Sequence, residues 1–180
     1  MSKSFLNIAG LPLGLRNNNP GNIRPTGDAW QGMIGTNEGF VVFQNIAYGI
    51  RAMATDIGND IRLDGLNTLT KLITEYAPPS ENDTQAYITR MVGYTGFGPN
   101  QVLPATDETL RKLIRGHIIV ELGAQYSPMI TDVDIQEGMS MMNGSLLAYF
   151  NISPGSGGAW LLYAAAAALF HTYRHKLFKL

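Results

Sequence analysis

The spacing of the apolar residues changes between Phe43 and Ile46, and this change restricts the fold more than any other feature of the sequence. Before it, the β-favouring run Phe40–Phe43 follows a polar turn that contains glycine, which predicts a β-hairpin over Trp30–Phe43. After it, apolar residues recur at helical intervals up to about Leu63, which predicts one amphipathic helix. A hairpin followed by helices is typical of an α+β domain.

Four further helices are predicted from capping residues, apolar spacing and helix-breaking residues. One is expected to be capped by Asn67 or Thr68, one to start near Asn82–Thr84, and one to begin with the capping box Thr131–Asp134. The remaining helix is expected to start at Asp107, with Asp107 and Glu108 in its first turn, where negative charge is favourable. The helix from Asp107 is expected to end at about Leu122, with Gly123 as its C-cap. The sequence therefore predicts a mainly helical α+β domain, with five helices around one short hairpin.

The composition is that of one ordinary domain with an appendage, because the chain has 180 residues, of which 45% are hydrophobic and 15% charged. The net charge of -1, and the lack of a basic stripe outside the last seven residues, argue against nucleic acid as a partner. There is no cysteine and there are only three histidines, so we expect no metal site and no cofactor. The N-terminal fifteen residues are interrupted by Pro12, which favours an extended arm over a secretory signal.

The C-terminal region differs in composition from the rest of the chain. Residues 153–158 are Gly and Ser with one Pro, which is typical of a flexible linker, so the domain is expected to cover residues 1–152. The apolar run Ala159–Phe170 is shorter than the ~20 residues that usually cross a bilayer. The longer stretch 157–173 reaches the lower limit of the usual length, and a basic flank follows it. Residues 159–180 are therefore predicted to form an apolar, transmembrane anchor helix. The alternative is a helix packed against the domain or against other subunits of a particle.

Five motifs in the first half of the chain carry a resemblance to a known family. They are, in order, Arg16–Arg24 (RNNNPGNIR), Trp30–Gly32, Phe40–Phe43, Tyr48–Ala52 and the run YAPPSENDTQAY at 76–87. In this order they resemble a phage virion family of peptidoglycan hydrolases and lytic transglycosylases, and they are also similar to autolysin-type glucosaminidases of the lysozyme superfamily. The resemblance covers most of the domain and implies a lysozyme-like fold that cleaves the glycan strands of peptidoglycan.

The position of the catalytic acid differs from the glucosaminidase pattern. In those enzymes a catalytic Glu ends a helix that precedes the Asn-rich loop, but here none of the fifteen residues before Arg16 is Asp or Glu. A circular permutation accounts for the difference, because members of the phage family have a late helix that ends in Ile-Ile-x-His-Glu-Asn-Gly. The stretch His117–Pro128 (HIIVELGAQYSP) matches it, with Val120 and Leu122 in place of the family's His and Asn. The resemblance thus implies Glu121 as the catalytic residue.

The sequence around Glu121 suits a general acid, which must keep its proton near neutral pH. Glu121 shares a helical face with apolar residues such as Leu113 and Ile114, and burial favours the protonated form of a carboxyl group. It also lies in the last turn of the helix, where the negative end of the helix dipole has the same effect. The alternative is a Glu at a helix end that simply turns into solvent.

A second carboxylate is harder to assign. Glu38, at the tip of the hairpin, is a secondary catalytic candidate, although a plain turn residue is the simpler interpretation. With one acid, the resemblance makes a lytic transglycosylase-like reaction reasonable, because the sugar's own 6-hydroxyl attacks and no enzyme nucleophile is needed. Hydrolysis of the glucosaminidase or muramidase type stays open.

Polar and aromatic residues near the expected groove are candidates for binding sugar: Asn17, Asn18, Asn22, Trp30 and Tyr126. The asparagines could bind hydroxyl or N-acetyl groups, or they could hold turns through Asx hydrogen bonds. Trp30 could stack on a sugar ring, or it could begin the hairpin as a core residue. His117, one turn before Glu121, is expected to be an ordinary half-buried histidine.

Together these observations predict a virion-associated muralytic enzyme that is held at a membrane and acts on the bacterial cell wall during genome entry. Its expected partners are glycan strands, membrane lipid through residues 159–180, and other virion proteins. One alternative is a non-catalytic structural protein that uses the same scaffold for particle assembly or glycan binding. A lysis endolysin fits less well, because the tail would hinder free diffusion.

Overall fold

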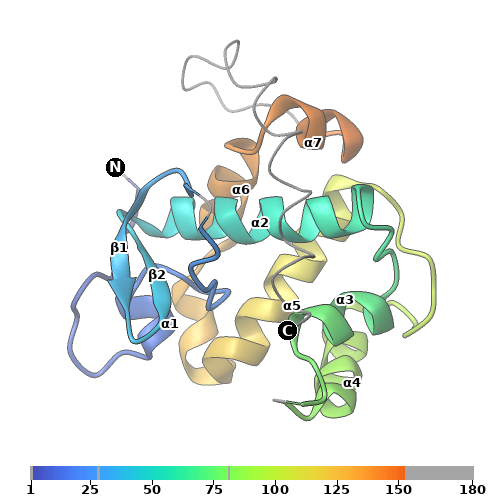
Figure 1. Ribbon diagram of the computed structural model, residues 1–180, viewed down its shortest axis with the longest axis horizontal. Coiled ribbons are helices and arrows are strands. Elements are labelled where there is room, and N and C mark those ends of the chain that lie inside the picture. Colours follow the sequence, from blue (N-terminus) through green and yellow to red (C-terminus); the bar gives the residue numbers. More distant parts are fainter. Residues whose placement is uncertain (1, 28, 81, 153–180) are drawn as a thin grey trace.

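A central helix organises the fold. The structure is a computed structural model that describes residues 2–27, 29–80 and 82–152. Its elements in chain order are α1 (Leu13–Arg16), β1 (Met33–Asn37), β2 (Phe40–Phe43), α2 (Ile46–Arg62), α3 (Leu69–Tyr76), α4 (Thr84–Thr95), α5 (Asp107–Tyr126), the 3-10 helix η1 (Ser127–Met129), α6 (Asp132–Ser140) and α7 (Gly144–Tyr149). Figure 1 shows α2 crossing the middle of the molecule, with the β1–β2 hairpin at one end, α7 on one side and α3 and α4 on the other.

The predicted hairpin is present at the expected position. β1 and β2 pair antiparallel, with Met33 opposite Phe43. Val41 and Phe43 are fully buried and pack with Ala52 of α2 in a small hydrophobic cluster. This cluster attaches the two-stranded sheet to the central helix, and the α+β fold class is confirmed.

The helices α3 and α6 begin at their predicted caps. The side chain of Thr68 accepts a hydrogen bond from the backbone of Lys71 at the start of α3, and Thr131 forms the predicted capping box with Asp134 at the start of α6. These caps satisfy backbone N–H groups that have no partner within their own helix.

The helix α5 is broken at the residue that the sequence predicts as its C-cap. Gly123 has a φ of 74° and a ψ of 166°, a conformation that residues with a side chain rarely adopt. The chain then makes a further helical turn up to Tyr126 before η1 begins. Glu121 therefore lies in the last regular turn before the break.

Two short helices differ from the sequence prediction. α1 lies in the N-terminal arm, which is expected to be extended, and Phe5 and Leu15 from this arm are buried in the main core. α7 places Leu146 and Phe150 against Gly58 of α2. Helices of four and six residues are too short for a helical period to be recognised. The prediction of five helices was therefore wrong, because the described part of the chain also contains α1 and α7.

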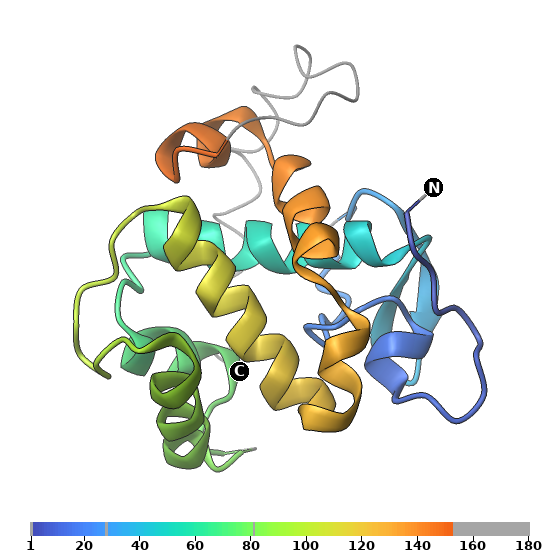
Figure 2. The ribbon, with the colours of Figure 1, turned by 180° about the vertical axis from the view of Figure 1, so that it is seen from behind.

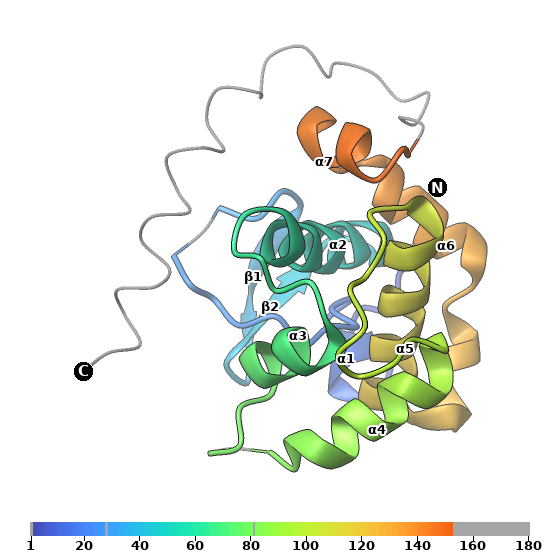
Figure 3. The same ribbon diagram turned by 90° about the vertical axis from the view of Figure 1, so that its right-hand side faces the viewer.

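The helices α3, α4 and α5 pack together next to α2. Figure 2, seen from behind, shows α5 running obliquely to α2, and Figure 3 shows α3 and α4 together on the same side of α2. The main hydrophobic cluster draws its residues from these helices, from α2 and from α6. Glu121 on α5 is thereby brought close to α4 and to the loop after α1, which are distant from it along the chain.

Two glycines let neighbouring segments approach the central helix closely. A Cβ atom at Gly138 of α6 would lie 2.6 Å from Cβ of Ile50, and one at Gly49 of α2 would lie 1.9 Å from the backbone oxygen of Asn18. Both distances are too short for non-bonded carbon and oxygen atoms, so these positions require glycine. The Asn-rich loop after α1 is thus pressed directly against α2.

No helix among residues 2–27, 29–80 and 82–152 is long and apolar enough to cross a membrane. The predicted linker at 153–158 and the predicted anchor helix at 159–180 lie outside the residues that the structure describes.

Candidate active site

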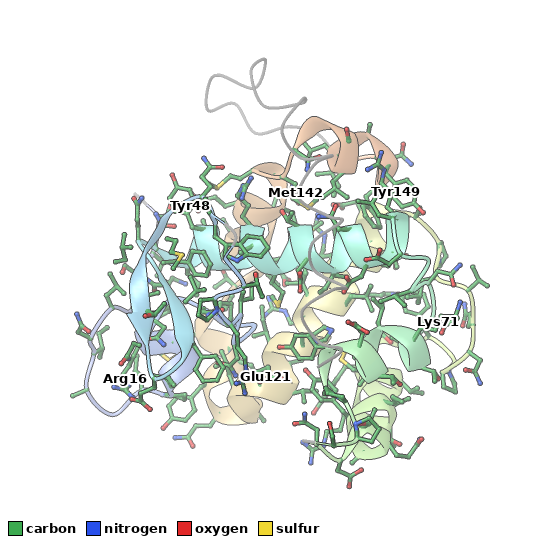
Figure 4. The ribbon with its side chains drawn as sticks, in the orientation of Figure 1. Arg16, Tyr48, Lys71, Glu121, Met142 and Tyr149 are labelled. Atoms are coloured by element: carbon green, nitrogen blue, oxygen red, sulfur yellow. The ribbon has the colours of Figure 1, made fainter. Side chains whose placement is uncertain are left out.

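The carboxylate of Glu121 is bound at both of its oxygens. Nδ2 of Asn22 donates to Oε2 at 2.7 Å, and the hydroxyl of Tyr87 donates to Oε1 at 2.8 Å. The side chain is half-buried, and in Figure 4 it lies between the hairpin side of the molecule and the α3–α4 side. Glu121 therefore does not turn freely into solvent, which was the alternative for a Glu at a helix end.

The hydroxyl of Tyr87 has a second partner in the core. It lies 2.9 Å from Nδ1 of His117, which is 1% exposed. The His117 ring meets the ring of Tyr76 edge-on, with 4.6 Å between the ring centres. Glu121, Tyr87 and His117 thus form a hydrogen-bonded row that leads from the half-buried carboxylate into the interior. His117 is fully buried, whereas the sequence predicts a half-buried histidine.

Burial determines the protonation of the aromatic groups in this row. It lowers the pKa of His117 from 6.5 to about 4, so the imidazole is neutral near pH 7. Burial also raises the pKa of Tyr76 and of Tyr87, and the nearby negative charge of Glu121 raises both further. Both phenols therefore keep their protons and remain hydrogen-bond donors.

Tyr76 holds the loop that supplies Asn22. Its hydroxyl donates to the backbone oxygen of Gly21 at 2.6 Å. Gly21 is itself pressed against Met53 of α2, because a Cβ there would lie 2.9 Å from the Met53 sulfur. Asn22 follows with a φ of 47°, a left-handed conformation that asparagine adopts more readily than most residues. These contacts aim its amide at the carboxylate.

Asn17 and Asn18, which precede Asn22, bond to segments outside their own loop. Asn18 is fully buried, its Oδ1 accepts from the backbone N–H of Phe5 at 2.8 Å, and its Nδ2 donates to the backbone oxygen of Phe43 at 3.1 Å. Asn17 is 2% exposed, and its Oδ1 accepts from Nδ2 of Asn37 at 3.0 Å. Asn18 therefore fits the structural alternative to sugar binding, whereas Nδ2 of the buried Asn17 has no hydrogen-bond partner among the described residues.

The other predicted site residues lie outside the hydrogen-bonded group around Glu121. Trp30 is half-buried under the hairpin, with Nε1 unpaired among the described residues. Tyr126 is half-buried and packs against the main core. Glu38 has a φ of 50° at the exposed hairpin tip, and it faces Arg16 at 3.7 Å in an ion pair. These placements favour the core interpretation of Trp30 and the turn interpretation of Glu38.

A pocket of about 230 Å³ opens beside Tyr87 at the start of α4. Its other lining residues are Asn82, Asp83, Ala86 and Arg90. Tyr87 therefore contributes to this pocket and also binds Glu121 through its hydroxyl. In the described ranges, no group of His, Asp and Glu is arranged to hold a metal ion.

The sequence patterns do not mark Tyr76 and Tyr87 as residues of the site. Both tyrosines lie at apolar positions of a helix. This spacing does not distinguish a tyrosine of the core from one whose hydroxyl binds a buried polar group. One signal was present, because the two tyrosines are the first and last residues of the motif at 76–87.

Comparison with known proteins identifies a relative in a bacterial virus. Over 116 residues the chain is 36% identical to Protein P5 of Pseudoalteromonas phage PM2, and the match covers 62% of this chain and 71% of that protein. The chain belongs to the family of this protein P5. It is therefore a phage protein, and a location in the virion fits membership of the P5 family. No protein-family model matches the chain.

Proposed function

We propose that this member of the P5 family is a virion-associated enzyme that cleaves the glycan strands of peptidoglycan, with Glu121 as its acid and base. The observation that carries the proposal is a half-buried carboxylate held at both oxygens by Asn22 and Tyr87, from two other segments. General acid catalysis of glycoside cleavage requires a carboxyl group fixed in position within reach of the leaving oxygen.

The proposed reaction uses one carboxyl group twice. Glu121 gives its proton to the glycosidic oxygen as the bond from that oxygen to C1 of the sugar breaks, and the sugar's 6-hydroxyl oxygen bonds to C1. The 6-hydroxyl loses its proton to the Glu121 carboxylate, which restores the acid. Glu38, paired with Arg16 at the hairpin tip, has no part in this sequence. Water in place of the 6-hydroxyl would give the hydrolytic product.

The pocket beside Tyr87 is the proposed place for a neighbouring part of the substrate. The amide of Asn82 can bind sugar hydroxyl groups, and the guanidinium of Arg90 can bind a carboxylate. Because Tyr87 contributes to this pocket and also binds Glu121, a glycan bound there would lie next to the acid.

A structural role is the second candidate, and the same two hydrogen bonds favour it. They join α5 to α4 and to the Asn-rich loop, so a carboxylate kept only for folding would have the same partners. In this case the domain would serve particle assembly or glycan binding without cleavage.

Digestion of labelled cell-wall sacculi by the full chain separates the two candidates. We expect the wild type to release soluble muropeptides and Glu121→Gln to be at least about 100-fold slower. The matched control is Glu108→Gln, the same substitution on the same helix at a side chain that is 75% exposed, and it should cleave like the wild type.

Two results would contradict the proposal. A folded, monodisperse wild type that releases nothing excludes the enzyme, and cleavage by Glu121→Gln at the wild-type rate excludes the assigned acid. The products also identify the reaction, since anhydro ends indicate a transglycosylase and reducing ends indicate a hydrolase.

We also propose that residues 159–180 hold the enzyme at a membrane. The support is the apolar run Ala159–Phe170 and the basic flank that follows it. In flotation with lipid vesicles, the full chain should rise with the lipid and a chain ending at residue 152 should not. A full chain that stays with the soluble fraction contradicts the anchor.

A further inference from the structure

The hydroxyl of Tyr87 has one proton but two partners within about 3 Å, and the side chain of Tyr76 is a further neighbour. Its oxygen lies 2.8 Å from Oε1 of Glu121 and 2.9 Å from Nδ1 of His117. A hydroxyl group donates one hydrogen bond and can accept others. Tyr87 can therefore donate to only one of these neighbours, and the other neighbour must donate to Tyr87.

The protonation of Glu121 decides the direction of these bonds. An ionised Glu121 can only accept, so Tyr87 donates to it, and Nδ1 of His117 must carry the hydrogen that the Tyr87 oxygen accepts. A protonated Glu121 donates to Tyr87, whose own proton then turns toward Nδ1 of His117. The imidazole stays neutral with its hydrogen on Nε2, because Nδ1 releases its hydrogen to water and Nε2 takes one from water, so that the only net gain is the proton on Glu121.

Asn22 determines which oxygen of Glu121 takes the proton. Its Nδ2 donates to Oε2 at 2.7 Å, which commits that oxygen to the role of an acceptor. The remaining oxygen, Oε1, faces Tyr87 and is the one that can carry the proton.

The groups around the row keep its aromatic members neutral. Tyr76 on α3 packs on His117, and Asp56 on α2 interacts with Tyr76. Burial lowers the pKa of His117 to about 4 and raises the pKa of both tyrosines, and the negative charge of Glu121 raises the pKa of the tyrosines further. Near neutral pH, a change at Glu121 therefore moves hydrogens along Tyr87 and His117 without charging either of them.

We propose that Tyr87 and His117 form a hydrogen-bond switch that reverses its direction each time Glu121 gains or loses its proton. Both are positioning residues, because Tyr87 stays bonded to Oε1 in both states and His117 always supplies the complementary donor or acceptor. The use of the switch in catalysis rests on the proposed function, in which Glu121 loses and regains a proton in every turnover. The reversal itself depends only on the fold.

Nitrogen-15 NMR of the full chain tests the switch, because a ring nitrogen with a hydrogen resonates differently from one without. Loss of signals in His117→Gln assigns His117 and separates it from His171 and His175. At about pH 9, well above the ordinary pKa range of carboxyl groups, we expect the wild-type His117 to carry its hydrogen on Nδ1. A hydrogen on Nε2 under these conditions overturns the proposal, and this measurement needs no site variant.

The variant Glu121→Gln tests the reversal. Its amide oxygen should accept from Asn22, which leaves its NH₂ group facing Tyr87 as a donor, like the protonated acid. We expect the His117 hydrogen to move to Nε2 in this variant. In a Tyr87→Phe background the tautomer should be the same with Glu or Gln at position 121. An unchanged tautomer in a folded Glu121→Gln that keeps Tyr87 overturns the proposal.

The sacculi assay answers a separate question. Tyr87→Phe should lower the cleavage rate by about 10- to 100-fold through misplacement of the acid. A tautomer change in a protein that never cleaves glycan would refute the proposed function and leave the switch standing. Cleavage without a tautomer change would refute the switch alone.

Discussion

Acidification should destabilise this fold through His117. In the unfolded chain a histidine takes up a proton near its ordinary pKa of 6.5, whereas burial lowers the pKa of His117 to about 4. Between these two values the unfolded state binds more protons than the folded state, so stability falls as the pH falls and is unaffected above about pH 7. The full effect is about 3 kcal/mol, and about 2 kcal/mol of it should have developed at pH 5.

Urea denaturation of the wild type and of His117→Gln, each at about pH 7 and pH 5, measures this effect. Gln can keep one hydrogen bond to Tyr87. The stability that is lost with the packing of the imidazole ring is the same at both pH values. His171, His175 and the carboxylates outside the Glu121 row are present in both proteins, so their contributions cancel in the comparison.

The expected result is a free energy of unfolding that falls by about 2 kcal/mol more in the wild type than in His117→Gln between about pH 7 and pH 5. An equal fall in both proteins would show that His117 is protonated as easily in the fold as in the unfolded chain. The buried, neutral imidazole at the end of the Glu121 row would then be excluded.

Two further variants test contacts that hold the fold together. Gly49→Ala should lower the free energy of unfolding by more than about 2 kcal/mol, because the new methyl group would lie 1.9 Å from a carbonyl oxygen of the Asn-rich loop. Gly93→Ala, on α4 with open space around it, is the control and should be stabilising by up to about 1 kcal/mol in the same denaturation assay. Asp134→Asn should cost about 1 kcal/mol near pH 7, since it weakens the cap of α6 and the bond to Lys3. Burial alone would raise the pKa of Asp134, but the bonds from Lys3 and Thr131 lower it, so this difference should be present above about pH 4 and disappear as the pH falls further. Equal stability of the wild type and Asp134→Asn near pH 7 would contradict the role of the cap.

Local sequence signals predict most of the fold, because they act within a few residues. The change of apolar period predicts the hairpin and α2, and Thr68 and Thr131 mark the starts of α3 and α6 through side-chain bonds to their own first turns. α1 and α7 are held by contacts to distant parts of the chain, such as those of Leu146 and Phe150 with α2. Such contacts leave no period in a segment of four or six residues.

The site is predicted less completely, because its residues meet only through tertiary structure. Family resemblance and a helical face select Glu121, but helical spacing cannot show that the hydroxyl of Tyr87 reaches its carboxylate. The asparagines of one loop look alike in sequence. The packing of the loop against α2 buries Asn18 and aims Asn22 at the acid, and that difference depends on the whole fold.

The bonds of Glu121 also affect how relatives of this protein should be compared. Glu121 joins residues that are 99 and 34 positions away along the chain, so its replacement leaves the amide of Asn22 and the phenol of Tyr87 without their partner. A lineage that stops cleaving glycan would still be selected to keep this glutamate for stability. Retention of the acid in a relative is therefore weak evidence of activity. Arg90 lines the pocket that we propose for the substrate, and a position with such a role alone would be replaced first and would record the loss of activity.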